Sequence, residues 1–348
     1  NAYTGKLIAD DPYIALYELT NENHFPEWML NGGFREWPSY FQRQLQARWN
    51  AWLRKQYGDD DTLRTAWVTL DEHESLENES VQLAPTLNRA DDFSESRLAD
   101  VHRFIYMLFI SYSQRLEKII RAAGSSSAQV PISWDTIHEP KSKWYYPCSE
   151  ADLVTIGTYA TGDIRQDRES CPVASPPNVL TNLSFASILD KATVVYETNS
   201  LKPDFWRAAY PLQIAAFASS HDWDGVFWYL WSDGTVHDQF DADTYVSSGL
   251  RYANASHQWH GAVISTDEVL LASLNAAGEI FIGFHMPAGD NPVIVTVGAH
   301  DLLGPGQWPG ELSIPYPENS LGPWKRANAL GTTDFRRTVR YRFDLAQR

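Results

Sequence analysis

Two short segments each place a glutamate close to side-chain amides. Glu22 stands between two asparagines at the end of an apolar run, residues 13–23, and Glu197 lies near the end of another, residues 193–199. Hydrolysis of a glycosidic bond with retention uses one carboxyl group as acid/base and another as nucleophile, about 5–5.5 Å apart. A glutamate in a buried strand is costly unless it is paired. We therefore interpret Glu22 and Glu197 as such a pair; the alternative is two solvated carboxylates at strand ends.

Neighbouring polar residues indicate how a sugar would be held. Asn21, an amide beside the acid, can bind the sugar 2-hydroxyl group, where hydrogen bonds strengthen in the transition state. Asn199 ends the second segment in a similar way. His24 follows the acid and either lines the cleft or packs within the loop. Glu18 has the same strand parity as the acid but lies four residues deeper, so we expect it in a buried ion pair.

Other chemistries find no support in the sequence. No metal-ligand spacing surrounds the two cysteines, Cys148 and Cys171, and neither a Gly-X-Ser-X-Gly elbow nor a phosphate-binding loop is present. Two glutamates can act without a metal ion or cofactor, so we expect neither. The cysteines bracket the apolar run 151–160, which leaves open a disulfide across one loop or two free thiols.

The elements that would position these residues alternate along the chain. Strands are predicted at residues 13–23, 129–135, 151–159, 193–199 and 225–231. Helices are predicted at residues 40–57, 60–67, 96–123, 180–189, 205–221 and 242–255. Alternating strands and helices predict an α/β fold with a parallel sheet and right-handed crossovers. Polar groups at the carboxyl ends of such strands are where α/β barrels keep their chemistry.

The pattern changes at about residue 260. Strands are predicted at residues 268–275, 279–285, 293–297 and 337–343, separated by turn signals. We therefore expect two domains. Residues 1–258 would form the α/β part, and residues 259–348 a small antiparallel, β-sandwich-like domain.

Composition narrows the range of partners. The chain has 348 residues and a formal net charge of −16, which argues against nucleic acid or an anionic membrane as a partner. No apolar run reaches the length of a membrane span. The 14 tryptophans and 17 tyrosines are either ordinary core residues or the lining of a sugar-binding cleft. The first residues do not form a signal peptide, as in a mature chain or a fragment, and we expect a secreted or periplasmic protein.

The chain resembles the retaining glycoside hydrolases of clan A, in particular cellulase-like family 5 or family 42 members. The resemblance covers roughly residues 1–235. It rests on residues 18–23, Tyr196-Glu197, 205–212 and 221–228, and on Tyr57, Leu63, Trp67, Arg97, Asp100 and Phe104 between them. This clan carries its catalytic glutamates on strands four and seven of a (β/α)8 barrel, which implies that residues 13–23 are strand four.

The resemblance implies roles for individual residues. Glu22 would be the acid/base and Glu197 the nucleophile, in a double displacement at a β-linked sugar. Asn21 would hold the 2-hydroxyl group, and Tyr159 would hydrogen-bond the nucleophile. In this chain that tyrosine stands in Gly157-Thr-Tyr159, without the His-X-Tyr of family 5.

The resemblance also implies that strand eight of the barrel carries an aromatic platform under the sugar. Trp228 and Trp231 are the candidates, and Trp228 is preferred because residues three apart cannot point the same way in a regular strand. β-Glucan, β-mannan and β-galactoside all remain open as substrates.

One departure from the clan is large. The sequence supplies strands four to eight of a (β/α)8 barrel, and strands one to three are not found in it. We expect an N-terminal segment or a second chain to complete the barrel, because an open half-barrel exposes a sheet edge and apolar surface. Two other readings are a carbohydrate-binding barrel without activity and a structural assembly module.

Overall fold

A sheet of five parallel strands forms the centre of the molecule. The computed structural model describes residues 5–68, 70–85, 93–124, 127–138, 145–161, 180, 183, 186–201, 206–231, 264–265, 267–289, 292–304 and 338–346. The strands follow one another across the sheet in chain order, β1-β2-β3-β4-β5. Their bounds are Tyr17–Asn21, Ile132–His138, Leu153–Thr161, Ala192–Leu201 and Gly225–Trp228. The predicted parallel sheet is confirmed, and it is compatible with part of an α/β barrel.

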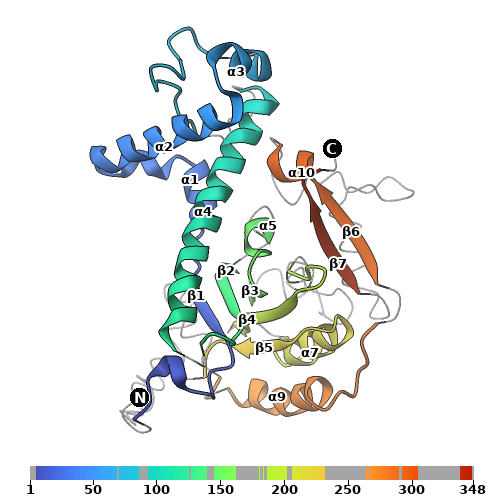
Figure 1. Ribbon diagram of the computed structural model, residues 1–348. Helices are drawn as coiled ribbons and strands as arrows, with labels where there is room; N and C mark the ends of the chain where they lie inside the picture. The colour runs from blue at the N-terminus through green and yellow to red at the C-terminus, as the bar shows by residue number, and fades with distance from the viewer. Residues whose placement is uncertain are drawn as a thin grey trace, which may run out of the picture.

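Long helices follow the strands, as predicted. Helix α4 (Glu95–Ala123) runs along β1 and β2, and α7 (Tyr210–Ser220) runs along β4 and β5 (Figure 1). Ser94 caps α4 by accepting a hydrogen bond from the Arg97 amide at 3.3 Å. None of the described helices combines the length and the apolar character needed to cross a membrane.

A helical insertion separates β1 from α4. It contains α1 (Phe25–Leu30), the 3-10 helix η2 (Gly33–Glu36), α2 (Ser39–Tyr57) and α3 (Asp60–Trp67). The predicted helices at 40–57 and 60–67 are thereby confirmed. Figure 1 shows α2 and α3 at the amino-terminal end of α4, beyond the carboxyl end of β1.

Aromatic packing holds the insertion to α4. The Trp49 ring lies 5.5 Å from Trp52, 6.0 Å from Trp67 and 5.0 Å from Phe104 of α4. Rings at these separations add to the energy of burial. The insertion is therefore fixed to the helix that covers the first two strands.

A second set of contacts in the insertion is polar and buried. Arg97 makes a bidentate ion pair with Glu74, at 2.8 and 2.7 Å. Asp100 accepts hydrogen bonds from the Trp67 indole at 2.8 Å and from the Tyr57 hydroxyl group. Tyr57, Trp67, Arg97 and Asp100, which carry part of the family resemblance, thus share one structural cluster.

The C-terminal region differs from its prediction. Residues 268–275 and 279–285 were expected as two strands, but α9 (Glu268–Phe281) covers all of the first and the beginning of the second, and it packs against α7. The Asp267 carboxylate caps this helix by accepting from Val269 and Leu270 at 3.1 and 3.2 Å. Short apolar runs do not distinguish a buried strand from a helix. The Asp267 cap is a signal in the sequence that favours the helix.

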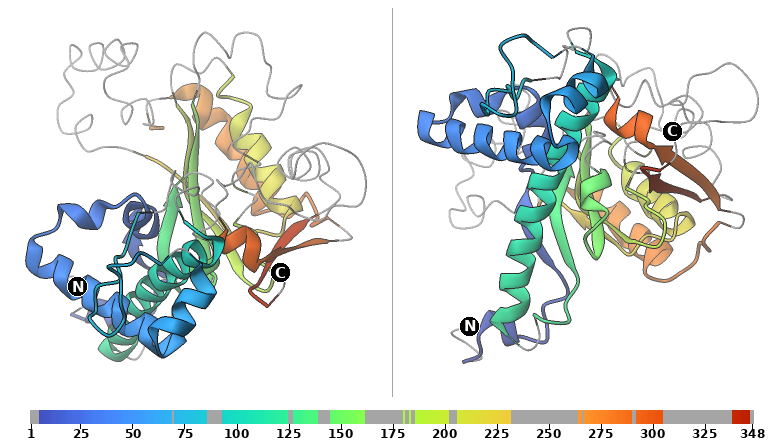
Figure 2. Two further views of the ribbon diagram at one scale, coloured as in Figure 1. Left: turned by 90° about the horizontal axis from the view of Figure 1, so that it is seen from above. Right: turned by 45° about the horizontal axis from the view of Figure 1, so that its top comes forward.

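The remaining C-terminal strands are parallel, so the antiparallel prediction is wrong. β6 (Val293–Gly298) pairs with β7 (Val339–Asp344) in parallel. Parallel neighbours need a crossover rather than a hairpin, and α10 (Ala299–Leu303) lies within that connection. The strand positions themselves agree with the prediction at 293–297 and 337–343 (Figure 2).

Strand β7 also contacts the central α/β region. The Tyr341 amide donates to the Ser187 carbonyl, and the Leu189 amide donates to the Tyr341 carbonyl, both at 2.8 Å. The end of the helix predicted at 180–189 is therefore an extended bridge. The helix predicted at 242–255 lies outside the described residues. Two short elements complete the description, η1 (Ile8–Asp10) and α5 (Tyr145–Cys148).

Candidate active site

The loop after β1 holds Glu22 in an unusual backbone conformation. Both Glu22 and His24 have φ of 48°, a left-handed value that is uncommon for residues other than glycine. The Glu22 amide donates to Thr136 Oγ1 at 2.7 Å, and the Asn23 amide donates to the Asp135 carboxylate at 3.1 Å. Neighbouring strand β2 therefore fixes a loop that would otherwise relax, and strain of this kind clusters at functional sites.

Asp135 is the centre of that support. Its side chain is 4% exposed, and it accepts from Thr20 Oγ1 at 2.9 Å as well as from the backbone of Asn23 and His24. Burial raises the pKa of Asp135 to about 6, against the lowering effect of these hydrogen bonds. Asp135 was not among the residues predicted for the site, although an aspartate at the end of the predicted strand 129–135 was a usable signal.

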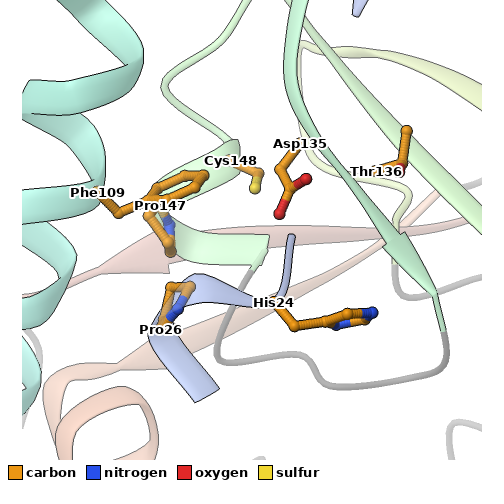
Figure 3. Close-up of a pocket in the computed structure, with 7 residues that line it drawn as sticks. All are labelled: His24, Pro26, Phe109, Asp135, Thr136, Pro147 and Cys148. Carbon is orange, nitrogen blue, oxygen red and sulfur yellow. The ribbon is translucent and has the colours of Figure 1, made fainter. Parts of the chain in front are cut away.

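Asn21 and His24 lie on either side of Glu22. Asn21 is exposed, and its Oδ1 accepts from the Thr136 hydroxyl group at 2.9 Å. His24 precedes α1 and lines a small pocket with Asp135, Thr136 and residues of α1, α4 and α5 (Figure 3). The free volume of this pocket, about 10 Å³, suits a single water molecule. It is far too small for a sugar.

Cys148 also lines this pocket. It is a buried free thiol, and burial raises its pKa well above the usual value. Cys171 lies outside the described residues.

Glu197 sits inside β4 rather than beyond its end. Its side chain is 9% exposed, and it pairs in register with Gly157 of β3. Tyr159, two residues further along β3, donates its hydroxyl group to Glu197 Oε1. Burial, and then this contact with a carboxylate, raise the pKa of Tyr159, which keeps the phenol protonated as a donor.

A second tyrosine joins the two glutamates. The Tyr196 hydroxyl group donates to Glu22 Oε1 at 2.7 Å, a contact between residues 174 positions apart. Glu22 and Glu197 are therefore brought to the same region, through the residue that directly precedes Glu197. Tyr196 is part of the family resemblance, but no role was predicted for it from the sequence.

Glu18 does not form the expected ion pair within the described residues. The charged groups that act on it there are the carboxylates of Asp135, Glu197 and Glu22. Burial, followed by these negative neighbours, raises the pKa of Glu18 to about 7. Among the described residues, the adjacent parallel strands gather carboxylates at this place and bring no cation beside Glu18.

The two tryptophans have different surroundings. The Trp228 ring packs against Tyr210 of α7, at 5.9 Å and 89°, and Trp231 is 63% exposed. Tyr229, between them, is the aromatic residue that faces Tyr159, with ring centroids 6.2 Å apart. Trp228 therefore packs toward the helix, whereas Tyr229, the residue after β5, contacts the tyrosine that binds Glu197.

Asn199 has a structural contact. It is buried, and its Nδ2 donates to the Tyr229 carbonyl at 2.7 Å. Its Oδ1 accepts from the Ser200 amide at 2.8 Å. The amide thus ties the end of β4 to the segment after β5.

These side chains define a class of site. Four carboxyl groups and two tyrosine hydroxyl groups come together on strands β1 to β4 and in the loop after β1. The protein is mixed α/β, and its sheet is compatible with part of an α/β barrel. Glu22 and Glu197 are separated by two strands, β2 and β3. An arrangement of this kind can transfer a proton and supply a carboxylate nucleophile.

Known proteins were compared with the chain by sequence and by structure. No family model matches the chain, and no curated protein matches it. Among solved structures, the chain is similar to the one described as "Structure of PfGH50B", with 10% sequence identity and a TM-score of 0.41. The match covers 68% of this chain and 33% of that chain. A similarity this weak carries no conclusion about activity.

Proposed function

We propose that the chain is the catalytic part of a retaining glycoside hydrolase that cleaves β-linked glycosidic bonds. The observation that supports this best is the hydrogen bond from Tyr196 to Glu22, which brings Glu22 into the region of Glu197. A tyrosine hydroxyl group contacts each glutamate. The family resemblance of residues 18–23 and Tyr196-Glu197 agrees with the same pair.

Each glutamate has its own role in the proposed double displacement. Glu22 protonates the leaving oxygen while Glu197 attacks the anomeric carbon, which gives a covalent glycosyl-enzyme. Glu22 then takes a proton from water as the water releases the sugar, so both groups return to their starting states. Asn21, whose Oδ1 is engaged by Thr136, has its Nδ2 donor for the sugar 2-hydroxyl group.

The sugar platform is the part of the sequence prediction that fits the contacts least well. Because Trp228 packs against α7, Tyr229 is the better candidate for contact with a sugar held beside Tyr159. Aromatic rings with a polar edge suit the apolar face of a pyranose.

Product stereochemistry tests the proposed reaction. Aryl β-glucoside, β-mannoside and β-galactoside are supplied in turn, and 1H NMR follows the anomer that forms first. The β-anomer is expected from a retaining enzyme. First release of the α-anomer would contradict the proposal, as would equal activity in a Glu197→Gln variant.

The barrel in this proposal is completed by further strands that pair with β1, from an N-terminal segment or a second chain. Within the described residues β1 pairs only with β2, so the backbone groups on its other edge can pair with a further strand. The segment before it exposes Ile8 and Tyr13, at 62% and 92%. Hydrogen exchange tests this, because the β1 amides that face away from β2 should exchange slowly in active protein. Fast exchange there would contradict completion at this edge.

A further inference from the structure

We infer that Tyr196 is a positioning residue for Glu22, held in place by a bulge in β4 and by the absence of a side chain at Gly157. The inference rests on the proposed function, because it assigns to Glu22 the acid/base role. It differs from the role of Tyr159, which contacts the other glutamate. The dipeptide Tyr196-Glu197 would then supply both the nucleophile and the residue that orients its partner.

The bulge is visible in the register on both sides of β4. Against β3, Ile156 pairs with Val195 and Gly157 pairs with Glu197, so Tyr196 is an additional residue. Against β5, Val226 pairs with Val195 and Trp228 pairs with Thr198, which again leaves one additional residue in β4. Consecutive residues of a regular strand point to opposite faces. A bulge redirects a side chain, and here Tyr196 and Glu197 both reach the carboxylate region.

Gly157 provides the space that the tyrosine ring needs. A Cβ atom at this position would lie 2.5 Å from Cε1 and 2.7 Å from Cζ of Tyr196, and 2.8 Å from the Glu197 carbonyl oxygen. The ring therefore crosses directly over β3 on its way to Glu22. Any side chain at position 157 would push the ring or the β4 backbone away.

The Tyr196 hydroxyl group contacts only one of the two carboxyl oxygens of Glu22 in the described hydrogen bonds. Tyr196 donates to Oε1 of Glu22, so the orientation of the carboxyl group is set and Oε2 is the oxygen left to exchange a proton with the substrate. Burial raises the pKa of the Tyr196 phenol, so it remains a donor. Among the described residues, the other ionisable groups around Glu22 and Tyr196 include Glu18 of β1, Asp135 of β2, Tyr159 of β3 and Glu197 of β4.

A titration that does not depend on activity tests the contact. The glutamate side-chain carboxyl carbons are labelled with 13C, and a Glu22→Gln variant assigns the Glu22 signal. Loss of a hydrogen bond to a charged group should move the Glu22 titration midpoint in Tyr196→Phe up by about one pH unit. Gly157→Ala should move it in the same direction, with the hydroxyl group still present. A midpoint unchanged in both variants would overturn the inference.

Tyr159→Phe is the matched control, because it removes the same hydroxyl group from the other glutamate. It should move the Glu197 signal and leave the Glu22 signal in place. Leaving-group dependence then tests the link to catalysis. Tyr196→Phe should slow cleavage of a sugar leaving group about 10-fold more than cleavage of a dinitrophenyl group, which needs no acid. Equal slowing in an active enzyme would overturn the positioning role, whereas absence of hydrolysis by the parent protein would refute only the proposed function.

Discussion

Glu22 and Glu197 reach the same region by opposite structural routes. Glu197 lies within a strand, is almost fully buried and is fixed by the sheet on both sides. Glu22 lies one residue beyond β1, in a left-handed conformation, and its loop is held by hydrogen bonds from β2 and β4. A nucleophile must approach one carbon atom along a fixed line, whereas an acid/base must first give and then take a proton. The rigid and the tethered position suit these two tasks.

The comparison also separates local from distant support. Tyr159, on the neighbouring strand, contacts Glu197, whereas Glu22 depends on Thr136, Asp135 and Tyr196, which are more than a hundred residues away in the chain. Substitutions of the two glutamates and of these supporting residues should therefore affect different properties, catalysis or stability, and by different amounts.

The largest effect is expected at the rigid position. Glu197→Gln removes the proposed nucleophile while keeping the volume of the side chain, so kcat should fall about 10⁴- to 10⁶-fold for every substrate. Steady-state kinetics on activated and unactivated β-glycosides measure this. A loss confined to unactivated substrates would assign Glu197 to the acid/base role instead.

A smaller and selective loss is expected at the tethered position. Glu22→Gln should reduce hydrolysis of a sugar leaving group about 10²- to 10⁴-fold, because the leaving oxygen then departs without a proton. Formation of the glycosyl-enzyme from a dinitrophenyl glycoside should be little affected, and a burst of dinitrophenol would show it. If that burst also disappears, Glu22 does more than transfer protons.

Removal of the support beneath Glu22 should reduce stability. Asp135→Asn replaces a buried acceptor of four hydrogen bonds by a group that accepts fewer, at a cost of about 1–3 kcal/mol in the free energy of unfolding. Urea unfolding measures this cost. An exposed change of the same kind, Asp61→Asn, is the control and should leave stability within about 0.5 kcal/mol.

The smallest effect is expected at Glu18, and it depends on pH. Its pKa in the folded protein, about 7, lies above the ordinary 4.5, so the folded state binds more protons between these values and loses stability as pH rises through them. Glu18→Gln removes this dependence. After allowance for partial exposure, the variant should be about 1 kcal/mol more stable than the parent at pH 8 and equal to it near pH 4. A difference that grows toward low pH would contradict this sign.

Sequence patterns predicted the five central strands because each is a short apolar run bounded by turn residues. They also located Glu22 and Glu197 near strand ends. Asp135 and Tyr196 were missed because their partners lie far away in the chain. The β4 bulge that directs Tyr196 is a property of strand register, which residue order alone does not reveal.

The C-terminal region was harder to predict for a different reason. The apolar residues of α9 fit a strand or a helix equally well over such short runs. The direction of β7 relative to β6 depends on the path of the chain between them. Trp228 was preferred as the sugar platform by its position in the strand, but its ring packs against Tyr210 of α7, a contact that residue order does not reveal.

Azide rescue tests the division of roles between the two glutamates most directly. Glu197→Ala and Glu22→Ala are each supplied with azide and an activated aryl β-glycoside, and the anomeric configuration of the glycosyl azide is read by NMR. Azide in place of the nucleophile should give the inverted α-azide from Glu197→Ala. Azide attack on the glycosyl-enzyme should give the retained β-azide from Glu22→Ala. The same anomer from both variants, exchanged anomers, or no glycosyl azide from either would contradict the account.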